Sequence, residues 1–173
     1  MNTDELKGFI RDIPDFPKPG IVFKDITPLL ADARALAATV DRIAEPFLGS
    51  VDLVLGIESR GFIVGAAVAY RLGVGMAIAR KPGKLPYLCV AQQYQLEYGV
   101  DSLEIHQDAM VANSRVLIVD DLLATGGTAE AAIGLVRALK GQVIGCAFII
   151  ELGFLQGRAR LGAAKCLSLI RYD

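Results

Sequence analysis

Apolar and polar positions recur along the chain in two patterns, one typical of buried strands and one typical of amphipathic helices. Short runs in which nearly every residue is apolar predict β-strands at 52–57, 74–79, 115–120, 143–150 and 166–170. Helices are expected at 3–12, 32–47, 60–72, 128–140 and 154–161. Asp32 is a suitable N-cap for the second helix, and Gly141 ends the fourth. Strands therefore alternate with helices, which predicts parallel β-α-β units in an open α/β sheet.

Three other segments do not follow either pattern. Three prolines and a glycine within residues 14–20 predict an extended, irregular chain, and residues 80–87 predict a loop. Residues 88–108 are compatible with a hairpin that has a mobile connection. Residues 61–79 are long and apolar enough to span a bilayer, but an internal arginine and four glycines favour a buried helix, a turn and a strand.

The composition favours one soluble domain over residues 1–173. Hydrophobic residues make up 53% of the 173 residues, enough for a sizeable core. The net charge of −1 argues against a protein that coats nucleic acid or an anionic membrane. Three cysteines without a C-x-x-C motif suggest a reducing compartment and no zinc site, and the first residues do not resemble a signal peptide. We therefore expect a cytoplasmic protein.

The strongest chemical signal is residues 116–128, VLIVDDLLATGGT. An apolar strand leads into two acids and then into a short loop that opens a helix. The loop residues are Ala124, Thr125, Gly126, Gly127 and Thr128. Glycines let backbone N–H groups approach a ligand, the threonines add hydroxyl donors, and a helix N-terminus favours negative charge. The loop is therefore predicted to bind one phosphate group.

The acids before the loop, Asp120 and Asp121, predict a second function. Carboxylates repel phosphate, but they accept hydrogen bonds from sugar hydroxyls or hold a metal-bound water. Acids beside a phosphate loop therefore favour a phosphorylated sugar as the ligand. The alternative is a capped helix with two solvated carboxylates.

Other phosphate and nucleophile motifs do not fit the sequence. It contains no G-x-x-x-x-G-K-[ST] loop, residues 73–78 lack the last glycine of the dinucleotide fingerprint, and residues 56–61 miss the G-x-S-x-G elbow by one position. His106 is the only histidine, and we expect it on the surface or in a loop. A serine triad is therefore disfavoured.

Two further strand ends carry positive charge. Arg60 follows the strand at 52–57 and stands at a helix N-terminus, and residues 80–84, RKPGK, place three cations in five residues. Each segment by itself has an alternative to anion binding: Arg60 can be a solvated arginine, and residues 80–84 can be a solubilising loop. Together with the phosphate loop, they predict a substrate with a phosphate at one end and a more highly charged group at the other.

These segments resemble the motifs of the type I phosphoribosyltransferase family. VLIVDDLLATGGT is similar to the family's phosphoribosyl-pyrophosphate motif. Residues 14–29, 58–62, 80–86 and 96–99 are similar to segments of the members that use adenine. The resemblance extends over about residues 14–152. It implies a mainly parallel sheet flanked by helices, a small N-terminal hood formed by about residues 1–30, and a flexible lid.

The resemblance also implies a reaction and a set of site residues. The reaction is a glycosyltransferase step of purine salvage: adenine and phosphoribosyl pyrophosphate give AMP and pyrophosphate, with Mg²⁺ held mainly by substrate and water. The 5′-phosphate is expected on residues 124–128, and the ribose hydroxyls at Asp120 and Asp121. The expected pyrophosphate ligands are Arg60, Arg80 and Lys84. The expected adenine pocket consists of Val22, Phe23, Lys24 and Leu152, with arginine in place of Lys24 in some relatives. A cis peptide at Glu58–Ser59 and a homodimer are also implied. The apolar stretch at residues 62–70 is suited to form part of the dimer interface.

The chemistry of the reaction adds an acid–base residue to this set. Departure of pyrophosphate leaves positive charge on the ribose, and the incoming purine nitrogen must lose a proton. Glu97 is our candidate for the proton transfer, and a solvent-facing strand carboxylate is the alternative. A closing lid would exclude water. Gln92, Gln93, Gly99 and the nearby tyrosines fit a polar, mobile lid. Within it, Tyr94 and Tyr98 are expected to pack against the protein rather than to stack on the base.

Two other functions are compatible with the same sugar-phosphate site. One is a transferase for xanthine or another purine. The other is a regulator that binds phosphoribosyl pyrophosphate without catalysis. Regulators of that kind usually carry a separate DNA-binding domain, for which 173 residues leave no room.

Overall fold

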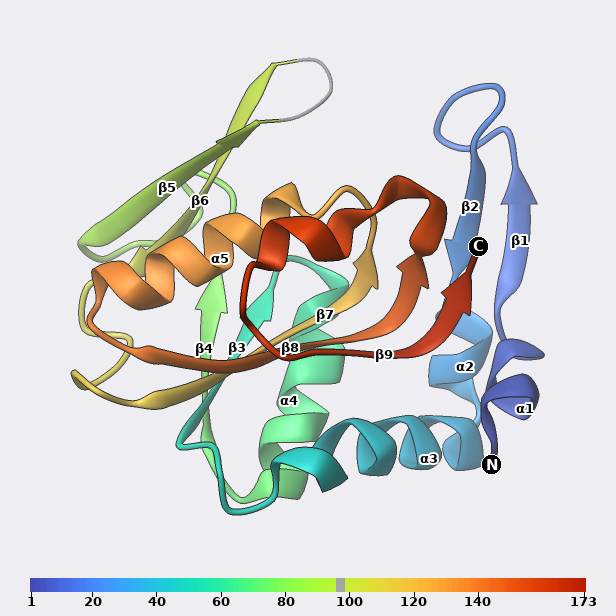
Figure 1. The fold of residues 1–173 in the computed structure, drawn as a ribbon, viewed down its shortest axis with the longest axis horizontal. Helices are drawn as coiled ribbons and strands as arrows, with labels where there is room; N and C mark the ends of the chain where they lie inside the picture. Colours follow the sequence, from blue (N-terminus) through green and yellow to red (C-terminus); the bar gives the residue numbers. More distant parts are fainter. Residues whose placement is uncertain (96–98) are drawn as a thin grey trace.

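A parallel β-sheet forms the centre of the molecule in a computed structural model that describes residues 1–95 and 99–173. Its strand order is β4-β3-β7-β8-β9 (Figure 1). The strands are β3 (Leu53–Ile57), β4 (Gly75–Ala79), β7 (Arg115–Leu123), β8 (Gln142–Leu152) and β9 (Cys166–Tyr172). All four pairings between them are parallel. The predicted open α/β sheet is confirmed.

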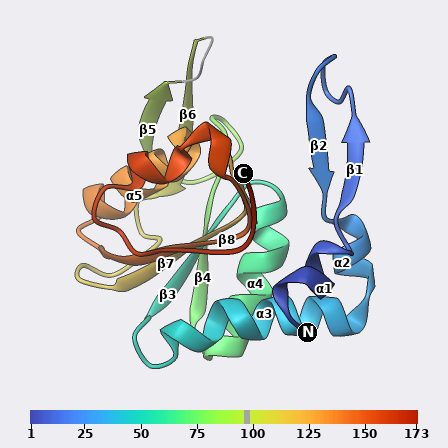
Figure 2. The same ribbon diagram turned by 45° about the vertical axis from the view of Figure 1, so that its right-hand side comes forward.

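Helices cover both faces of this sheet (Figures 1 and 2). The helices α3 (Ala33–Ala44) and α4 (Arg60–Leu72) lie on one face, and α5 (Gly127–Ala138) lies on the other. Successive residues of β7 divide between the two cores: Leu117 packs with α3 and α4, whereas Ile118 packs with α5. Burial on both faces explains why the strands are continuous apolar runs rather than alternating ones.

Two antiparallel hairpins stand on either side of the carboxyl ends of the sheet strands (Figures 1 and 2). One consists of β1 (Arg11–Pro14) and β2 (Val22–Asp25), and the other of β5 (Cys89–Gln95) and β6 (Val100–His106). The second hairpin confirms the hairpin interpretation of residues 88–108. Parallel strands bring their carboxyl ends to one edge, so the hairpins enclose the edge at which ligands of such sheets bind.

The N-terminal segment differs from the prediction. The helix expected at 3–12 is shorter than predicted: only α1 (Thr3–Lys7) forms. A capping box between Asn2 and Glu5 stabilises its N-terminus. Residues from Arg11 onward instead pair with β2, and this tertiary pairing overrides the local helical pattern. A short helix that the pattern did not predict, α2 (Thr27–Ala31), follows β2.

The structure also tests the predictions for residues 154–161 and 61–79. The helix expected at 154–161 is a pair of 3₁₀ turns, η2 (Gly153–Leu155) and η3 (Gly157–Leu161). They are separated by Gln156, whose φ of 53° breaks an α-helix. The apolar stretch at 61–79 is α4, a turn at Gly73 and β4. Within the described ranges, no helix combines the length and apolarity that a membrane crossing requires.

Candidate active site

The loop of residues 124–128 connects β7 to α5 at the carboxyl edge of the sheet. Gly126 has a φ of 84°, a left-handed conformation that glycine adopts readily. A methyl group at Gly126 would lie 2.3 Å from the carbonyl oxygen of Gly157, and one at Gly157 would lie 2.1 Å from that of Ala124. The loop therefore rests directly on the backbone at Gly157. Thr125, Gly126 and the end of β7 line a small cavity of about 80 Å³.

Gly157 is a site residue that the sequence interpretation missed. It lies about thirty positions after the loop that it supports, in the connection between β8 and β9. No local motif marks it. Only the close backbone approach in the folded chain reveals why a side chain is excluded there.

The two acids at the end of β7 lie beside this loop. The backbone N–H of Asp121 donates to Asp120 Oδ1 at 2.9 Å, and Asp121 Oδ2 lies 3.2 Å from Arg60 Nη1. Burial and the neighbouring Asp121 carboxylate raise the pKa of Asp120 well above its ordinary value. A methyl group at Gly61 would lie 2.7 Å from Asp120 Oδ1, so a glycine in the first turn of α4 lets the acid approach closely. The structure thus brings the predicted sugar-binding acids together with the predicted cation Arg60.

The other predicted cations, Arg80 and Lys84, surround the partly buried carboxylate of Glu58. Glu58 Oε1 accepts hydrogen bonds from Arg80 Nη2 at 3.1 Å and from Lys84 Nζ at 2.6 Å. Glu58 Oε2 accepts one from the backbone N–H of Lys81 at 2.7 Å. Burial alone would raise the pKa of Glu58, but these hydrogen bonds lower it to about 2. The peptide bond between Glu58 and Ser59 is cis, as the resemblance implied.

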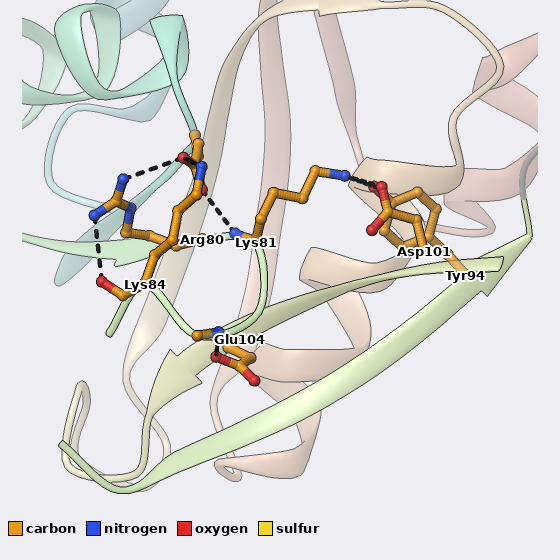
Figure 3. A network of polar contacts seen from close by, with 8 residues as sticks. Arg80, Lys81, Lys84, Tyr94, Asp101 and Glu104 are labelled. Atoms are coloured by element: carbon orange, nitrogen blue, oxygen red, sulfur yellow. Dashed lines mark hydrogen bonds and ion pairs between the residues drawn. The ribbon is translucent and has the colours of Figure 1, made fainter. Parts of the chain in front are cut away.

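Lys81 has a different environment from its two neighbours. Figure 3 shows its side chain extending away from Arg80 and Lys84 toward Tyr94 and Asp101 of the β5–β6 hairpin. Its amino group donates to Asp101 and to the Tyr94 hydroxyl. Only two of the three cations in the 80–84 segment therefore face the substrate edge.

A larger cavity, of about 590 Å³, lies between the β1–β2 hairpin and the ends of β8 and β9. It is lined by Gly20, Ile21, Val22, Lys24, Thr125, Leu152, Phe154, Leu155, Tyr172 and Asp173. Three of the four residues expected around adenine therefore line one cavity, together with Thr125 of the phosphate loop. Phe154 and Tyr172 were not anticipated; Tyr172 ends β9, two residues beyond the last predicted strand, at the same sheet edge.

The positions of Lys24 and Phe23 follow from the alternation of β2. Lys24 Nζ donates to Asp12 at 2.7 Å and lies 4.0 Å from the centre of the Tyr172 ring. Phe23 is not among the residues that line the cavity, and its ring lies 4.9 Å from the Arg60 guanidinium. Phe23 thus contacts the edge of the predicted pyrophosphate site, and Lys24 the wall of the large cavity.

The predicted lid residues lie on the second hairpin or next to it. Gln92, Gln93 and Tyr94 belong to β5, and Tyr94 is buried, as its packing role predicted. Glu97 and Tyr98 lie outside the described residues. The role of Glu97 stays a prediction.

Comparison with known proteins agrees with this geometry. The family model for the phosphoribosyl transferase domain matches residues 23–170. The adenine phosphoribosyltransferase of Geobacter metallireducens is 56% identical over 170 residues, which cover 98% of this chain and 99% of that protein. The one from Koribacter versatilis is 57% identical over 171 residues, with coverages of 98% and 94%.

Solved structures of the same kind superpose closely on this chain. The adenine phosphoribosyltransferase of Thermoanaerobacter pseudethanolicus has a TM-score of 0.96 and 52% identity, covering 99% of this chain and all of that one. The Saccharomyces cerevisiae protein, solved with adenine and an imino-altritol bisphosphate, has a TM-score of 0.91 and 40% identity, with coverages of 96% and 97%. The chain belongs to the phosphoribosyltransferase family and, within it, to the adenine phosphoribosyltransferases.

Proposed function

We propose that the protein transfers the phosphoribosyl group of phosphoribosyl pyrophosphate to adenine, forming AMP and pyrophosphate in purine salvage. The observation that carries this proposal is that Thr125 lines both the small phosphate cavity and the large cavity under the hairpin. A nucleotide whose phosphate lies on residues 124–128 would thus extend its base toward Val22, Lys24 and Leu152. We assign the covering hairpin and its flanks, about residues 1–30, to a hood within a single domain of residues 1–173.

The proposed reaction breaks one bond and forms one bond at the anomeric carbon. The bond to the pyrophosphate oxygen breaks, and its electron pair leaves with pyrophosphate toward Arg60, Arg80 and Lys84. The purine nitrogen forms the new bond and gives its proton to a base, the role proposed for Glu97. Asp120 and Asp121 are placed to accept hydrogen bonds from the ribose hydroxyls and to face the positive charge that develops on the sugar.

The residues at this edge fit a magnesium ion that the substrate largely holds. Among residues 1–95 and 99–173, no group of three His, Cys, Asp or Glu side chains is placed to bind a metal by itself. Mg²⁺ commonly keeps several waters and takes one or two carboxylates together with substrate phosphates. Asp120 and Asp121 are the carboxylates adjacent to the phosphate loop, and they would hold it through water. When bound, Mg²⁺ would neutralise charge on the departing pyrophosphate.

We further propose a homodimer formed through α3 and α4. Tyr70 of α4 is 90% exposed, and Ile63 on the same helix is half exposed. Both lie within residues 62–70, the stretch expected to form part of the interface. Leu36, Val40 and Ala67 line an apolar groove between the two helices. Burial of these side chains against a second copy would remove apolar surface from water.

A cytoplasmic location is proposed from the cysteines. Cys146 and Cys166 are register partners on neighbouring strands β8 and β9, and both are free thiols. Free thiols at adjacent positions are expected in a reducing compartment.

Turnover by the purified protein tests the proposed function. Phosphoribosyl pyrophosphate and Mg²⁺ are supplied with adenine, hypoxanthine, guanine or xanthine, and nucleotide and pyrophosphate are quantified. AMP formation with adenine as the preferred base is the expected result. Preference for xanthine or another purine would support the alternative transferase. Binding of phosphoribosyl pyrophosphate without any product would support the non-catalytic regulator.

A further inference from the structure

Tyr94 lies between the two loops to which the proposed function assigns the ends of the substrate. Its side chain is 5% exposed, and it belongs to β5 of the second hairpin. One end of the side chain contacts the 80–84 segment, and the ring contacts the start of α5. The proposed mechanism does not use this residue.

The hydroxyl of Tyr94 connects to the 80–84 segment through Lys81. It accepts a hydrogen bond from Lys81 Nζ at 2.5 Å and donates one to Asp101 Oδ2 at 3.1 Å. Lys81 also forms an ion pair with Asp101, as Figure 3 shows. Burial lowers the pKa of Lys81, but the bonds to Asp101 and Tyr94 outweigh it and keep the pKa above its ordinary value. Lys81 is therefore a charged anchor rather than a free substrate ligand.

Backbone hydrogen bonds also connect the 80–84 segment to the β5–β6 hairpin. Arg80 and Glu104 exchange two backbone hydrogen bonds, of 2.9 and 2.7 Å. The backbone N–H of Gly83 donates to the Glu104 carboxylate at 3.0 Å. The segment that presents Arg80 and Lys84 is therefore joined to β6 at three points, and its position depends on the position of the hairpin.

The ring of Tyr94 connects the same hairpin to the phosphate loop. A methyl group at Gly127 would lie 3.0 Å from Tyr94 Cδ2 and 3.1 Å from the carbonyl oxygen of Gln95. That carbonyl accepts a hydrogen bond from Arg160 Nη1 at 3.2 Å. The aromatic ring is thus packed against the first residue of α5, within the predicted 5′-phosphate site.

We propose that Tyr94, through its hydrogen bonds with Lys81 and Asp101, is a positioning residue that sets the spacing between the cationic 80–84 segment and the phosphate loop. This inference rests on the proposed function, because it needs one substrate that occupies both loops. Phosphoribosyl pyrophosphate carries a phosphate at one end and pyrophosphate at the other. A spacing fixed before binding lowers the ordering cost only for a ligand that spans it.

The test is Tyr94→Phe, which keeps the ring on Gly127 and removes the hydroxyl. Calorimetry with Mg²⁺ and without adenine measures the affinity of three probes: phosphoribosyl pyrophosphate, AMP and pyrophosphate. We expect the two-ended ligand to bind about 3- to 10-fold more weakly, the change that loss of one hydrogen bond produces. AMP and pyrophosphate alone, each of which reaches one loop, should stay within about twofold of the wild type.

Two further variants complete the test. Asp101→Asn removes the charge that holds Lys81 and should give the same selective loss. Tyr87→Phe, on an exposed tyrosine near the same hairpin, is the matched control and should change none of the three affinities. Equal weakening of all three ligands in Tyr94→Phe, or no weakening at all, would overturn the proposal. A wild-type protein that fails to bind phosphoribosyl pyrophosphate overturns the proposed function itself, and the inference with it.

Discussion

Replacement of Gly157 by alanine tests the assignment of the phosphate loop from outside the loop. The added methyl group would lie 2.1 Å from the carbonyl oxygen of Ala124, and ordinary contact begins at 3.4 Å. The two backbone segments must therefore separate by about 1.3 Å. A displacement of about 1 Å in a binding site can cost on the order of 100-fold in rate. We expect Gly157→Ala to reduce AMP affinity and kcat/KM for phosphoribosyl pyrophosphate by up to about 100-fold.

The assay must separate a displaced loop from an unfolded protein. Overpacking of this size destabilises by about 1–3 kcal/mol, so circular dichroism and thermal unfolding should show a folded protein with a lowered Tm. Gly75→Ala is the control, because a methyl group there meets only Leu53 Cδ1, at 3.5 Å. The control should bind AMP as the wild type does. A folded Gly157→Ala protein with AMP affinity and turnover within twofold of the wild type would refute the placement of the 5′-phosphate on this loop.

Three further substitutions test the charged groups of the site. The pKa of Glu58 is about 2 against an ordinary 4.5, so its ion pairs stabilise the fold above pH 4.5 and are lost between pH 4.5 and about 2. Glu58→Gln should lower the free energy of unfolding by about 1–2 kcal/mol at pH 7, after allowance for solvent screening, and by much less near pH 2. Chemical denaturation at both pH values measures the difference. The pKa of Asp120 is raised, so its ionisation costs stability as the pH rises above its ordinary value. Asp120→Asn should therefore unfold at a higher temperature than the wild type at pH 7 and at the same temperature near pH 3, and it should lose turnover. Glu97→Gln should lower kcat by about 100-fold with little change in the affinity for phosphoribosyl pyrophosphate, and unchanged kcat would remove Glu97 from the proton transfer.

The parts of the fold that the sequence predicts well are those determined by local pattern. Helix α4 begins at Arg60 and ends at Leu72, as expected, because a turn into the helix and Gly73 after it mark both ends. Asp32 caps α3 by accepting two backbone hydrogen bonds. The central sheet follows because continuous apolar runs have one stable environment, between two helical layers.

The missed parts depend on contacts between distant residues. Strand β1 exists because residues 11–14 pair with residues 22–25 across a loop that contains two prolines, and no local pattern within either segment indicates its partner. The same holds for the site. Gly157, beyond the end of β8, contacts the backbone of the predicted phosphate loop, and Tyr172 lines the large cavity from the last strand. Local motifs predicted the groups that are expected to contact substrate, but not the groups that hold those motifs in place.

The ion pairs of the site show why the groups that hold the predicted binding residues in place matter. Each of the cations predicted to bind pyrophosphate already has an acidic partner: Arg60 pairs with Asp121, and Arg80 and Lys84 pair with Glu58. Partly buried cations without such partners would repel one another and carry an uncompensated desolvation cost. An incoming polyanion must therefore exchange with, or add to, these internal pairs, and its net binding energy is a difference between two charge-assisted sets of contacts. The arrangement keeps the cations in position before substrate arrives. If pyrophosphate binds these cations as proposed, the arrangement also favours its release, because Glu58 and Asp121 can form their ion pairs with the cations again.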